Sequence, residues 1–561
     1  TGPVTDIFCP MYYPYDACES YCENDPDKPL IQCEYAHAMG NSGGGFKEYW
    51  DLVRRYPAYQ GGFIWDFVDQ SVRWRDAGGK MFYGYAGDFD RYDVDKDQNF
   101  CNNGLLSPDR RLNPHAYEVR HIYQSIWARP ADLSTAEISV RNENFFRDLS
   151  AYRLEWELLA DGQVMMQGSE EEVNAEPQDS VRIALGYDPS SLEPGKEWML
   201  NVRFVLKRAE APLPAGHVVA YNQIPLTGYA YDAELRNASR PNEAIPDPVF
   251  DDSDRRYLIL TGEDFRLEFN RSDGFISLYE SRGHSLLRPG TVLRPNFWRA
   301  GTDNDYGAGL QNKNAVWCNP TFGLVSLSHE VKDGMAQVTA EYEIPEVGAR
   351  LAMEYAVNNQ GVVKVTQRMA AGGAGNETAG NDGTSASGVP DMFRFGLRME
   401  MPPEYDVVEY YGKGPFENYA DRQEAALTGI YRQSVEEQFY PYIRPQETGT
   451  RTGLRWWEVL DASGTGLRFT SDAPFSASAL EYDIEALDDG PEKDNRHPSD
   501  LVKAGATCLC IDKVQAGLGC VDSWGALPLE KYRLHYEDRE FTFIMRPVFH
   551  RYDMRVTKTN F

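Results

Sequence analysis

The stretch that most constrains the fold is residues 30–46, LIQCEYAHAMGNSGGGF. A short apolar run from Leu30 to Cys33 ends at the carboxylate of Glu34, and three glycines then precede a helical pattern that begins at Phe46. This order predicts a strand, a loop and a helix. In parallel α/β architectures the carboxyl ends of strands carry the chemistry, so Glu34 is a candidate nucleophile or general acid/base.

Strands and helices alternate in the first part of the chain. A helix is predicted over 46–56, a buried strand over 61–67 and a short helix over 114–124, with a short strand at 5–12 ahead of them. This spacing is typical of parallel barrels. Only about three barrel strands are visible, whereas a closed barrel needs about eight.

Two further carboxylates, Asp66 and Asp69, follow the second strand. An ion pair or a helix cap explains each of them more simply than an acid catalyst does. We therefore find no second carboxylate in the chain to pair with Glu34 as the general acid.

The pattern changes near residue 129 to alternating runs separated by polar turns, which predicts a β-sandwich over 129–230. A polar segment at 231–250 is predicted to be a linker. Alternating runs then continue through 251–561, a length that suits one large sandwich. The low-complexity insert near 371–388 is expected to be mobile.

Composition bounds the function. A chain of 561 residues needs several domains. Its formal net charge of −30 repels phosphate groups, which argues against nucleic acid and anionic membranes as partners. No apolar run is long enough to span a membrane.

The nine cysteines are scattered and form no CxxC pair, which argues against a zinc site and implies no disulfide framework. The chain starts at Thr1, so we expect its N-terminus to have been processed or cut. The compartment stays open between cytoplasm and periplasm.

Three motifs in the first part carry a family resemblance: CEYAHAMGNS (33–42), QGGFIWDFVDQS (60–71) and NFCNNGL (99–105). They resemble the catalytic barrel of the glycoside hydrolase family 2 β-galactosidases of the large bacterial, lactose-cleaving type. The resemblance continues in YGKGPFENYADR (411–422) and GCVDSWG (519–525).

The resemblance implies a multidomain fold. Residues 1–128 would be the C-terminal part of a (β/α)8 TIM barrel. Residues 129–230 would be an immunoglobulin-like β-sandwich, and 251–561 a large C-terminal β-sandwich, or supersandwich. The implied activity is the retaining hydrolysis of terminal β-D-galactose residues. Two alternatives stay open: another family 2 glycosidase, such as a β-glucuronidase or β-mannosidase, and a non-catalytic carbohydrate-binding module.

The resemblance also implies residue roles. Glu34 matches the nucleophile, and Tyr12 a tyrosine that hydrogen-bonds it. His37 matches a galactose-contacting histidine, and Trp65 part of the sugar-binding floor. From the residues alone, a surface ion pair, a core histidine and a core tryptophan would be the simpler explanations.

Further roles lie downstream of the second strand. The Phe100 carbonyl and the Asn103 amide match ligands of a sodium ion near the sugar, although NNG is also an ordinary turn. Trp524 matches a tryptophan on the aglycone side of the pocket. RAGTDNDYG (299–307) resembles the active-site flap of the family, and a plain turn is its simpler explanation.

In the family, the acid/base glutamate and the magnesium ligands lie upstream of what corresponds to Thr1 here. The chain by itself is therefore expected to be inactive or nearly so. The implied partners are a β-galactoside substrate and further copies of the parent chain in a homo-oligomer.

Overall fold

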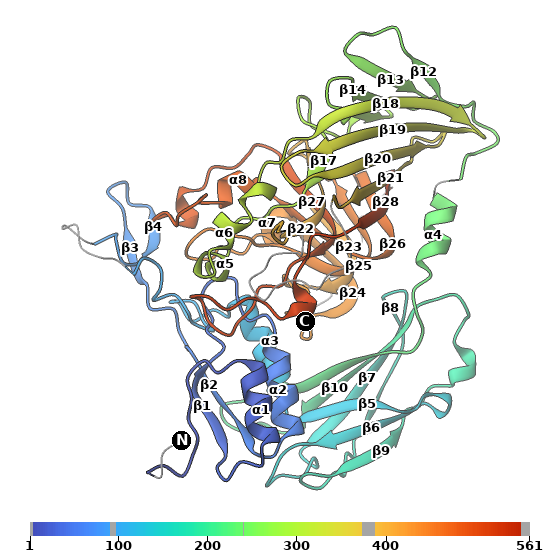
Figure 1. Cartoon of the computed structure of the whole chain (residues 1–561). Helices are drawn as coiled ribbons and strands as arrows, with labels where there is room; N and C mark the ends of the chain where they lie inside the picture. Colours follow the sequence, from blue (N-terminus) through green and yellow to red (C-terminus); the bar gives the residue numbers. More distant parts are fainter. Residues whose placement is uncertain (1–3, 90–96, 239, 373–387, 551–561) are drawn as a thin grey trace.

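A small α/β segment begins the chain, and antiparallel β-structure makes up most of the rest (Figure 1). The computed structural model describes residues 4–89, 97–238, 240–372 and 388–550. Most of the predicted low-complexity insert lies outside these residues.

The N-terminal segment is built on two parallel strands, with Leu30 opposite Tyr59 and Tyr35 opposite Ile64. Helix α2 follows the first strand, and its spacing puts Phe46 on the buried face. The elements are α1 (Tyr15–Glu23), β1 (Leu30–Tyr35), α2 (Phe46–Arg55), β2 (Tyr59–Ile64), β3 (Val72–Arg75), β4 (Met81–Gly84) and α3 (Pro114–Ile122).

Two details of this segment differ from the sequence-based expectation. The strand predicted at 5–12 is reduced to isolated bridges from Phe8 to Leu30 and from Met11 to Glu34. Helix α1 was not anticipated. Its mixed sequence, YDACESYCE, buries only Cys18 and carries a weak apolar periodicity.

Two antiparallel sheets follow and share one hydrophobic core, in which Ile138 and Val140 of the first sheet meet Leu154 and Val202 of the second. The first sheet has the order β5-β6-β9 and the second β11-β10-β7-β8. The strands are β5 (Ile126–Asp132), β6 (Glu137–Asn142), β7 (Tyr152–Ala160), β8 (Gln163–Glu170), β9 (Ser180–Ala184), β10 (Trp198–Leu206) and β11 (Val218–Pro225).

The segment expected to be a linker, 231–250, begins with helix α4 (Tyr231–Ala238) and ends inside strand β12 (Val249–Asp251). In Figure 1 it connects the lower sheets to the upper part of the molecule. The expected linker is therefore helical over its first half.

The C-terminal part contains a five-stranded sheet, β12 to β16, and a twelve-stranded sheet. Nine strands of the larger sheet follow the path β17-β22-β27-β26-β28-β21-β20-β19-β18, and the other three join it through β26, which pairs with β25, as β25 does with β23 and β23 with β24. One large core joins them, with Leu260 and Phe269 of the smaller sheet in the same cluster as Met353 of the larger. The smaller sheet's other strands are β13 (Tyr257–Thr261), β14 (Phe265–Asn270), β15 (Ile276–Ser281) and β16 (His284–Ser285).

The larger sheet and its connections complete the fold. Its strands are β17 (Arg294–Asn296), β18 (Gly323–Lys332), β19 (Met335–Ile344), β20 (Ala349–Val357), β21 (Val363–Ala370), β22 (Arg394–Met401), β23 (Val407–Gly414), β24 (Leu427–Ser434), β25 (Arg451–Leu460), β26 (Thr465–Leu480), β27 (Thr507–Gln515) and β28 (Arg539–Phe549). The helices are α5 (Asp303–Gly307), α6 (Leu310–Lys313), α7 (Val435–Gln438) and α8 (Ile484–Leu487). Short 3-10 turns lie at Leu133–Thr135, Pro189–Ser191, Ala315–Trp317, Pro498–Asp500 and Glu530–Tyr532.

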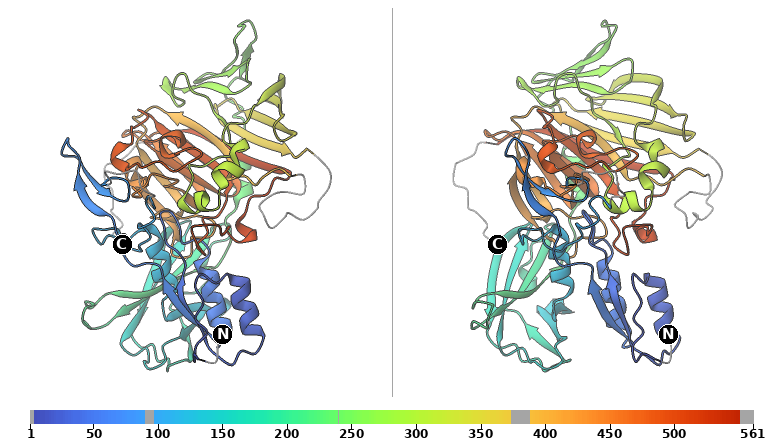
Figure 2. Two further views of the ribbon diagram at one scale, coloured as in Figure 1. Left: turned by 60° about the vertical axis from the view of Figure 1, so that its left-hand side comes forward. Right: turned by 90° about the vertical axis from the view of Figure 1, so that its left-hand side faces the viewer.

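Loops of the N-terminal segment contact the C-terminal part. Figure 2 shows the arrangement of the two parts from two further sides. The Asn41 amide donates to the Tyr419 hydroxyl at 3.0 Å and to the Glu447 carbonyl at 2.7 Å. A Cβ on Gly44 would lie 2.0 Å from a carboxylate oxygen of Asp421. The glycines after Glu34 thus allow two distant parts of the chain to touch.

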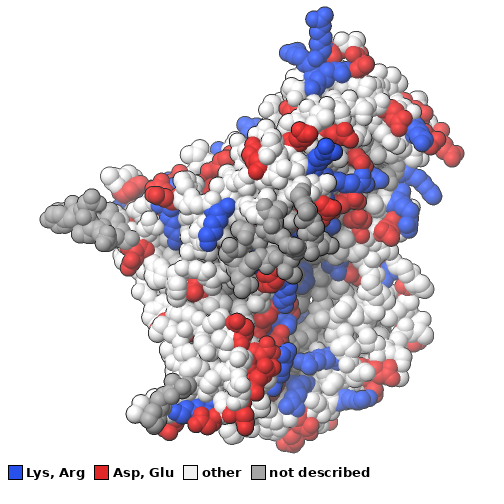
Figure 3. All heavy atoms as spheres, viewed as in Figure 1, with Lys and Arg blue, Asp and Glu red and all other residues white. Residues whose placement is uncertain are grey.

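None of the helices among the described residues is long and apolar enough to cross a membrane. Over the described part of the face in Figure 3, acidic and basic side chains lie next to one another.

Candidate functional site

Glu34 lies at the carboxyl end of β1, on the same edge as the end of β2. The two strands run parallel, and Trp65 follows β2 directly. The Ala38 amide donates to the Trp65 carbonyl at 2.9 Å, which ties the two strand ends together. Trp65 is 39 % exposed, so part of its ring is open at this edge.

Tyr12 lies beside Glu34. Its backbone amide donates to the Glu34 carbonyl at 2.8 Å, and its φ of 49° turns the chain at this point. Burial and the hydrogen bond from its hydroxyl to the Glu34 carboxylate raise the pKa of Tyr12 above its ordinary value. Tyr12 therefore stays protonated and donates to the carboxylate.

His37 is buried at 1 % exposure and is held from two sides. Burial lowers the pKa of His37 to about 4, so the ring is neutral near pH 7. Its Nε2 lies 3.3 Å from Asn103 Nδ2, and its Nδ1 lies 2.7 Å from Ser523 Oγ. Because Asn103 Nδ2 can only donate, His37 Nε2 accepts this hydrogen bond. The proton of neutral His37 therefore lies on Nδ1, which donates to Ser523.

The hydrogen-bond chain continues beyond His37. Ser523 Oγ donates to Asn304 Oδ1 at 2.7 Å, and Asn304 Nδ2 donates to the carbonyls of Leu518 and Gly519, each at 3.0 Å. The orientation of His37 is thus set by residues almost 500 positions away.

Trp524 completes an aromatic cluster at this edge. Its ring centroid lies 4.7 Å from that of Tyr12, 5.2 Å from that of His37 and 6.2 Å from that of Phe100. The side chain is 48 % exposed. The structure therefore brings together all the predicted residues around Glu34, from 12 to 524.

Asn103 offers an oxygen that suits a cation. Its Nδ2 donates to the Phe100 carbonyl at 2.8 Å, whereas its Oδ1 is buried and has no hydrogen-bond partner among the described residues. A buried acceptor without a donor is costly, and a hard cation takes such oxygens as ligands. The donor set present fits a partial sodium site. The described residues contain no group of three or more His, Cys, Asp or Glu side chains placed to hold a metal ion.

Among the residues that the structure describes, neither carboxylate after β2 forms an ion pair or caps a helix. Asp69 accepts from the Gly104 amide at 2.8 Å and from Asn113 Nδ2 at 3.0 Å, so it braces the loop that carries Asn103. Burial raises the pKa of Asp69 to about 7. Asp66 accepts from Gln70 at 2.7 Å, and burial raises its pKa as well.

The segment resembling a flap, 299–307, contains the short helix α5, which starts with a capping box between Thr302 and Asp305. Arg299, the first residue of the segment, is 1 % exposed and forms a two-pronged ion pair with Asp305 at 2.7 and 2.9 Å. The segment is thus a helix anchored in the interior rather than the plain turn that was its simpler explanation.

Asp303, in this helix, joins the N-terminal segment to the C-terminal part. Its Oδ1 accepts from Asn99, Arg444 and Lys493, each at 2.9 Å, and its Oδ2 accepts from Gln446 at 2.8 Å. Although burial alone would raise it, Arg444 and Lys493 hold the pKa of Asp303 well below its ordinary value. Asp303 therefore carries a full negative charge that fixes the start of the loop bearing Phe100 and Asn103.

Sequence reasoning missed Ser523, Asn304 and Asp303 as individual contributors. Ser523 directly precedes Trp524, and the other two lie in the segment that resembles a flap. Those motifs were therefore the only signals available.

Three family models match the chain in the order that its motifs suggest. The glycosyl hydrolases family 2 TIM barrel domain matches residues 3–128, β-galactosidase domain 4 matches 138–227, and the β-galactosidase small chain matches 261–545. The chain belongs to the β-galactosidases of glycoside hydrolase family 2. The predicted resemblance is thereby confirmed.

Curated relatives from this family are similar along nearly the whole chain. A β-galactosidase of Halalkalibacterium halodurans is 32 % identical over 96 % of this chain and 50 % of its own length. One of Lactobacillus delbrueckii subsp. bulgaricus is 34 % identical over 97 % of this chain and 50 % of its own length. The chain thus spans about half the length of the curated relatives it matches.

Proposed function

We propose that this chain supplies the nucleophile of a retaining β-galactosidase that releases terminal β-D-galactose from β-galactosides. The observation that carries the proposal is Glu34 at the end of a parallel strand, with the Tyr12 hydroxyl on its carboxylate and aromatic rings around it. Aromatic faces suit the C–H face of a sugar. The family membership and the relatives named β-galactosidase support the same substrate class.

In the proposed mechanism, a Glu34 carboxylate oxygen attacks the anomeric carbon of galactose. The bond from that carbon to the glycosidic oxygen breaks as an acid protonates the leaving oxygen, and a galactosyl ester on Glu34 results. Water then attacks the anomeric carbon after giving a proton to the same acid, now a base, and the ester bond breaks. Two inversions give net retention.

The residues around Glu34 have positioning roles in this proposal. Tyr12 holds the attacking carboxylate, and neutral His37 contacts the sugar through a ring fixed by Ser523. Trp65 forms part of the sugar-binding floor, and Trp524 lies on the aglycone side. The Phe100 carbonyl and Asn103 Oδ1 would hold a sodium ion, which supplies a fixed positive charge for sugar hydroxyls.

The acid/base carboxylate and the magnesium ligands are assigned to a polypeptide segment outside this chain. The same proposal treats 1–128 as the C-terminal part of a TIM barrel, 129–230 as an immunoglobulin-like sandwich, and 251–561 as a large sandwich. Assembly into a homo-oligomer stays a prediction.

The test is hydrolysis of an aryl β-galactoside by this chain alone and after mixing with the N-terminal half of a relative. We expect little activity alone, activity on mixing, and its loss in Glu34→Gln. Glu19→Gln, an exposed carboxylate paired with Arg55, is the matched control and should retain activity. Full activity in mixed Glu34→Gln would refute the nucleophile assignment.

A further inference from the structure

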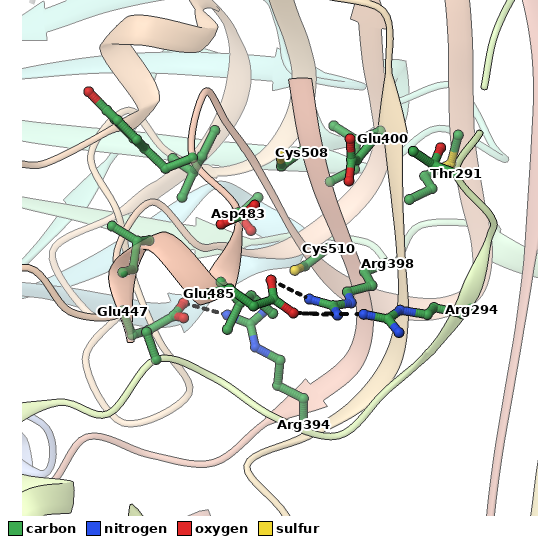
Figure 4. A pocket seen from close by; sticks show the side chains of 18 of the residues that line it. Thr291, Arg294, Arg394, Arg398, Glu400, Glu447, Asp483, Glu485, Cys508 and Cys510 are labelled. Carbon is green, nitrogen blue, oxygen red and sulfur yellow. Dashed lines mark hydrogen bonds and ion pairs between the residues drawn. The ribbon is translucent and has the colours of Figure 1, made fainter. Parts of the chain in front are cut away.

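A cavity of about 370 Å³ lies in the C-terminal part, and Glu34 is not among its lining residues (Figure 4). This volume falls within the range of small-molecule sites. All of its lining residues lie between positions 290 and 510. Those the argument uses are Arg394, Arg398, Glu400, Ser478, Tyr482 and Cys508.

The floor of the cavity is one face of three neighbouring strands, β22, β27 and β26. Pairing places Arg398 opposite Cys510 and Cys510 opposite Ser478, with Glu400 opposite Cys508 in the next row. The alternate residues of β22 point into the hydrophobic core. The floor is thus a polar face on a rigid sheet, and its register fixes the spacing of its side chains.

The guanidinium groups of the cavity already have carboxylate partners. Arg398 makes a two-pronged ion pair with Glu485 at 2.6 and 2.9 Å, and Arg294 lies 3.7 Å from the same carboxylate. Arg394, 1 % exposed, pairs with Glu447 at 2.5 Å and with Asp512 at 2.7 Å. Figure 4 shows Glu485 between Arg398 and Arg294, and Glu447 beside Arg394. Each of the three lining guanidinium groups therefore lies within ion-pair distance of a carboxylate, so no cation among the described lining residues is left free for an anion.

Polar groups with unused hydrogen-bonding capacity remain. The Ser478 side chain is 4 % exposed, and its hydroxyl has no partner among the described residues. Glu400 accepts from Arg288 through Oε2 at 2.7 Å, and its Oε1 has no hydrogen-bond partner in the described part of the chain. The half-buried ring of Tyr482, with Leu480 beside it in the lining, adds an apolar wall. Free donors and acceptors beside an apolar wall, where the lining guanidinium groups are already paired, match a neutral polyhydroxy compound better than an anion.

We propose that this cavity is a second carbohydrate site, which binds a neutral mono- or disaccharide through Glu400, Ser478 and Tyr482. The cavity volume admits a ligand of that size and excludes a longer chain buried whole. The site does not include Glu34. The two proposals are therefore independent, and the failure of one would not affect the other.

The test is calorimetric titration of the full chain with D-galactose, D-glucose and lactose at millimolar concentrations, with inorganic phosphate as the anionic arm. We expect saturable binding of at least one sugar and none of phosphate. Glu400→Gln should weaken sugar binding by about tenfold, because a charged acceptor is lost. Trp524→Ala, at the Glu34 edge, should leave this binding unchanged.

A filling variant and its control complete the design. Cys508→Phe places a ring in the cavity and should abolish binding, whereas Cys318→Phe makes the same change at an exposed cysteine and should not. If circular dichroism shows that Cys508→Phe is unfolded, Glu400→Gln decides. The proposal is overturned by absence of saturable sugar binding, by unchanged affinity in Glu400→Gln, by binding that Trp524→Ala removes, or by phosphate binding in place of sugar.

Discussion

Replacing Asp303 with Asn tests whether one buried charge holds the N-terminal segment to the C-terminal part. The Asp303 side chain is fully buried and accepts four hydrogen bonds, two of them from the cations Arg444 and Lys493. In Asp303→Asn the shape is kept, and Arg444 retains Asp489 at 2.7 Å. Lys493 loses the carboxylate with which it pairs. One buried ion pair thus loses its negative partner. Removing one partner in this way costs about 3–5 kcal/mol.

The assay is urea unfolding of the full chain, with hydrogen exchange of residues 97–103 as a local probe of the loop that Asn99 anchors. Asp51→Asn, at an exposed pair with Lys47, is the matched control and should change stability by about 0.5 kcal/mol or less. A common unfolding midpoint and common exchange rates for the two variants would refute the reasoning.

The pH dependence provides a second check on the same variant. The pKa of Asp303 is depressed in the folded chain, so its stabilisation is complete above the pKa of an unfolded aspartate. It declines as the pH falls below that value toward the folded pKa. The stability difference between the wild-type chain and Asp303→Asn should therefore be constant near neutrality and shrink in acid.

Three further predictions concern the candidate site. His37, with its pKa lowered to about 4, should show no titration of its ring nitrogens by NMR between about pH 8 and 5.5. The stability of the folded chain should decline below about pH 6.5, because the unfolded state takes up the proton first. A ring pKa near 6.5 in the folded chain would contradict the burial argument. Gly44→Ala should lower stability by about 2–3 kcal/mol in thermal unfolding, because its Cβ would overlap the buried Asp421. Gly228→Ala, whose Cβ would meet open space and whose φ is likewise not positive, is the matched control and should change stability little. Trp524→Ala should lower kcat/KM of the mixed enzyme by about tenfold or more on an aryl β-galactoside, since it removes a ring from the sugar edge; unchanged kcat/KM would remove Trp524 from the site.

Local order was readable from the sequence. The apolar run before Glu34 predicts β1, and the spacing of Phe46, Tyr49 and Leu52 predicts α2, because both depend on contacts within a few residues. The alternating runs likewise correspond to β6, β7, β10, β14 and β19. The motifs around Glu34 and Trp524 carried the family, which the matching family models confirm.

Only the tertiary structure decided which distant residues meet. No periodicity links His37 to Ser523, or Asp303 to Lys493, because such pairs form when separate sheets pack and their loops meet. The polar cavity over β22, β27 and β26 depends on the register of these three strands. The sequence alone shows only that polar and apolar residues alternate along each strand. The sequence thus determined the elements and the identity of the candidate nucleophile, whereas long-range packing determined what surrounds it.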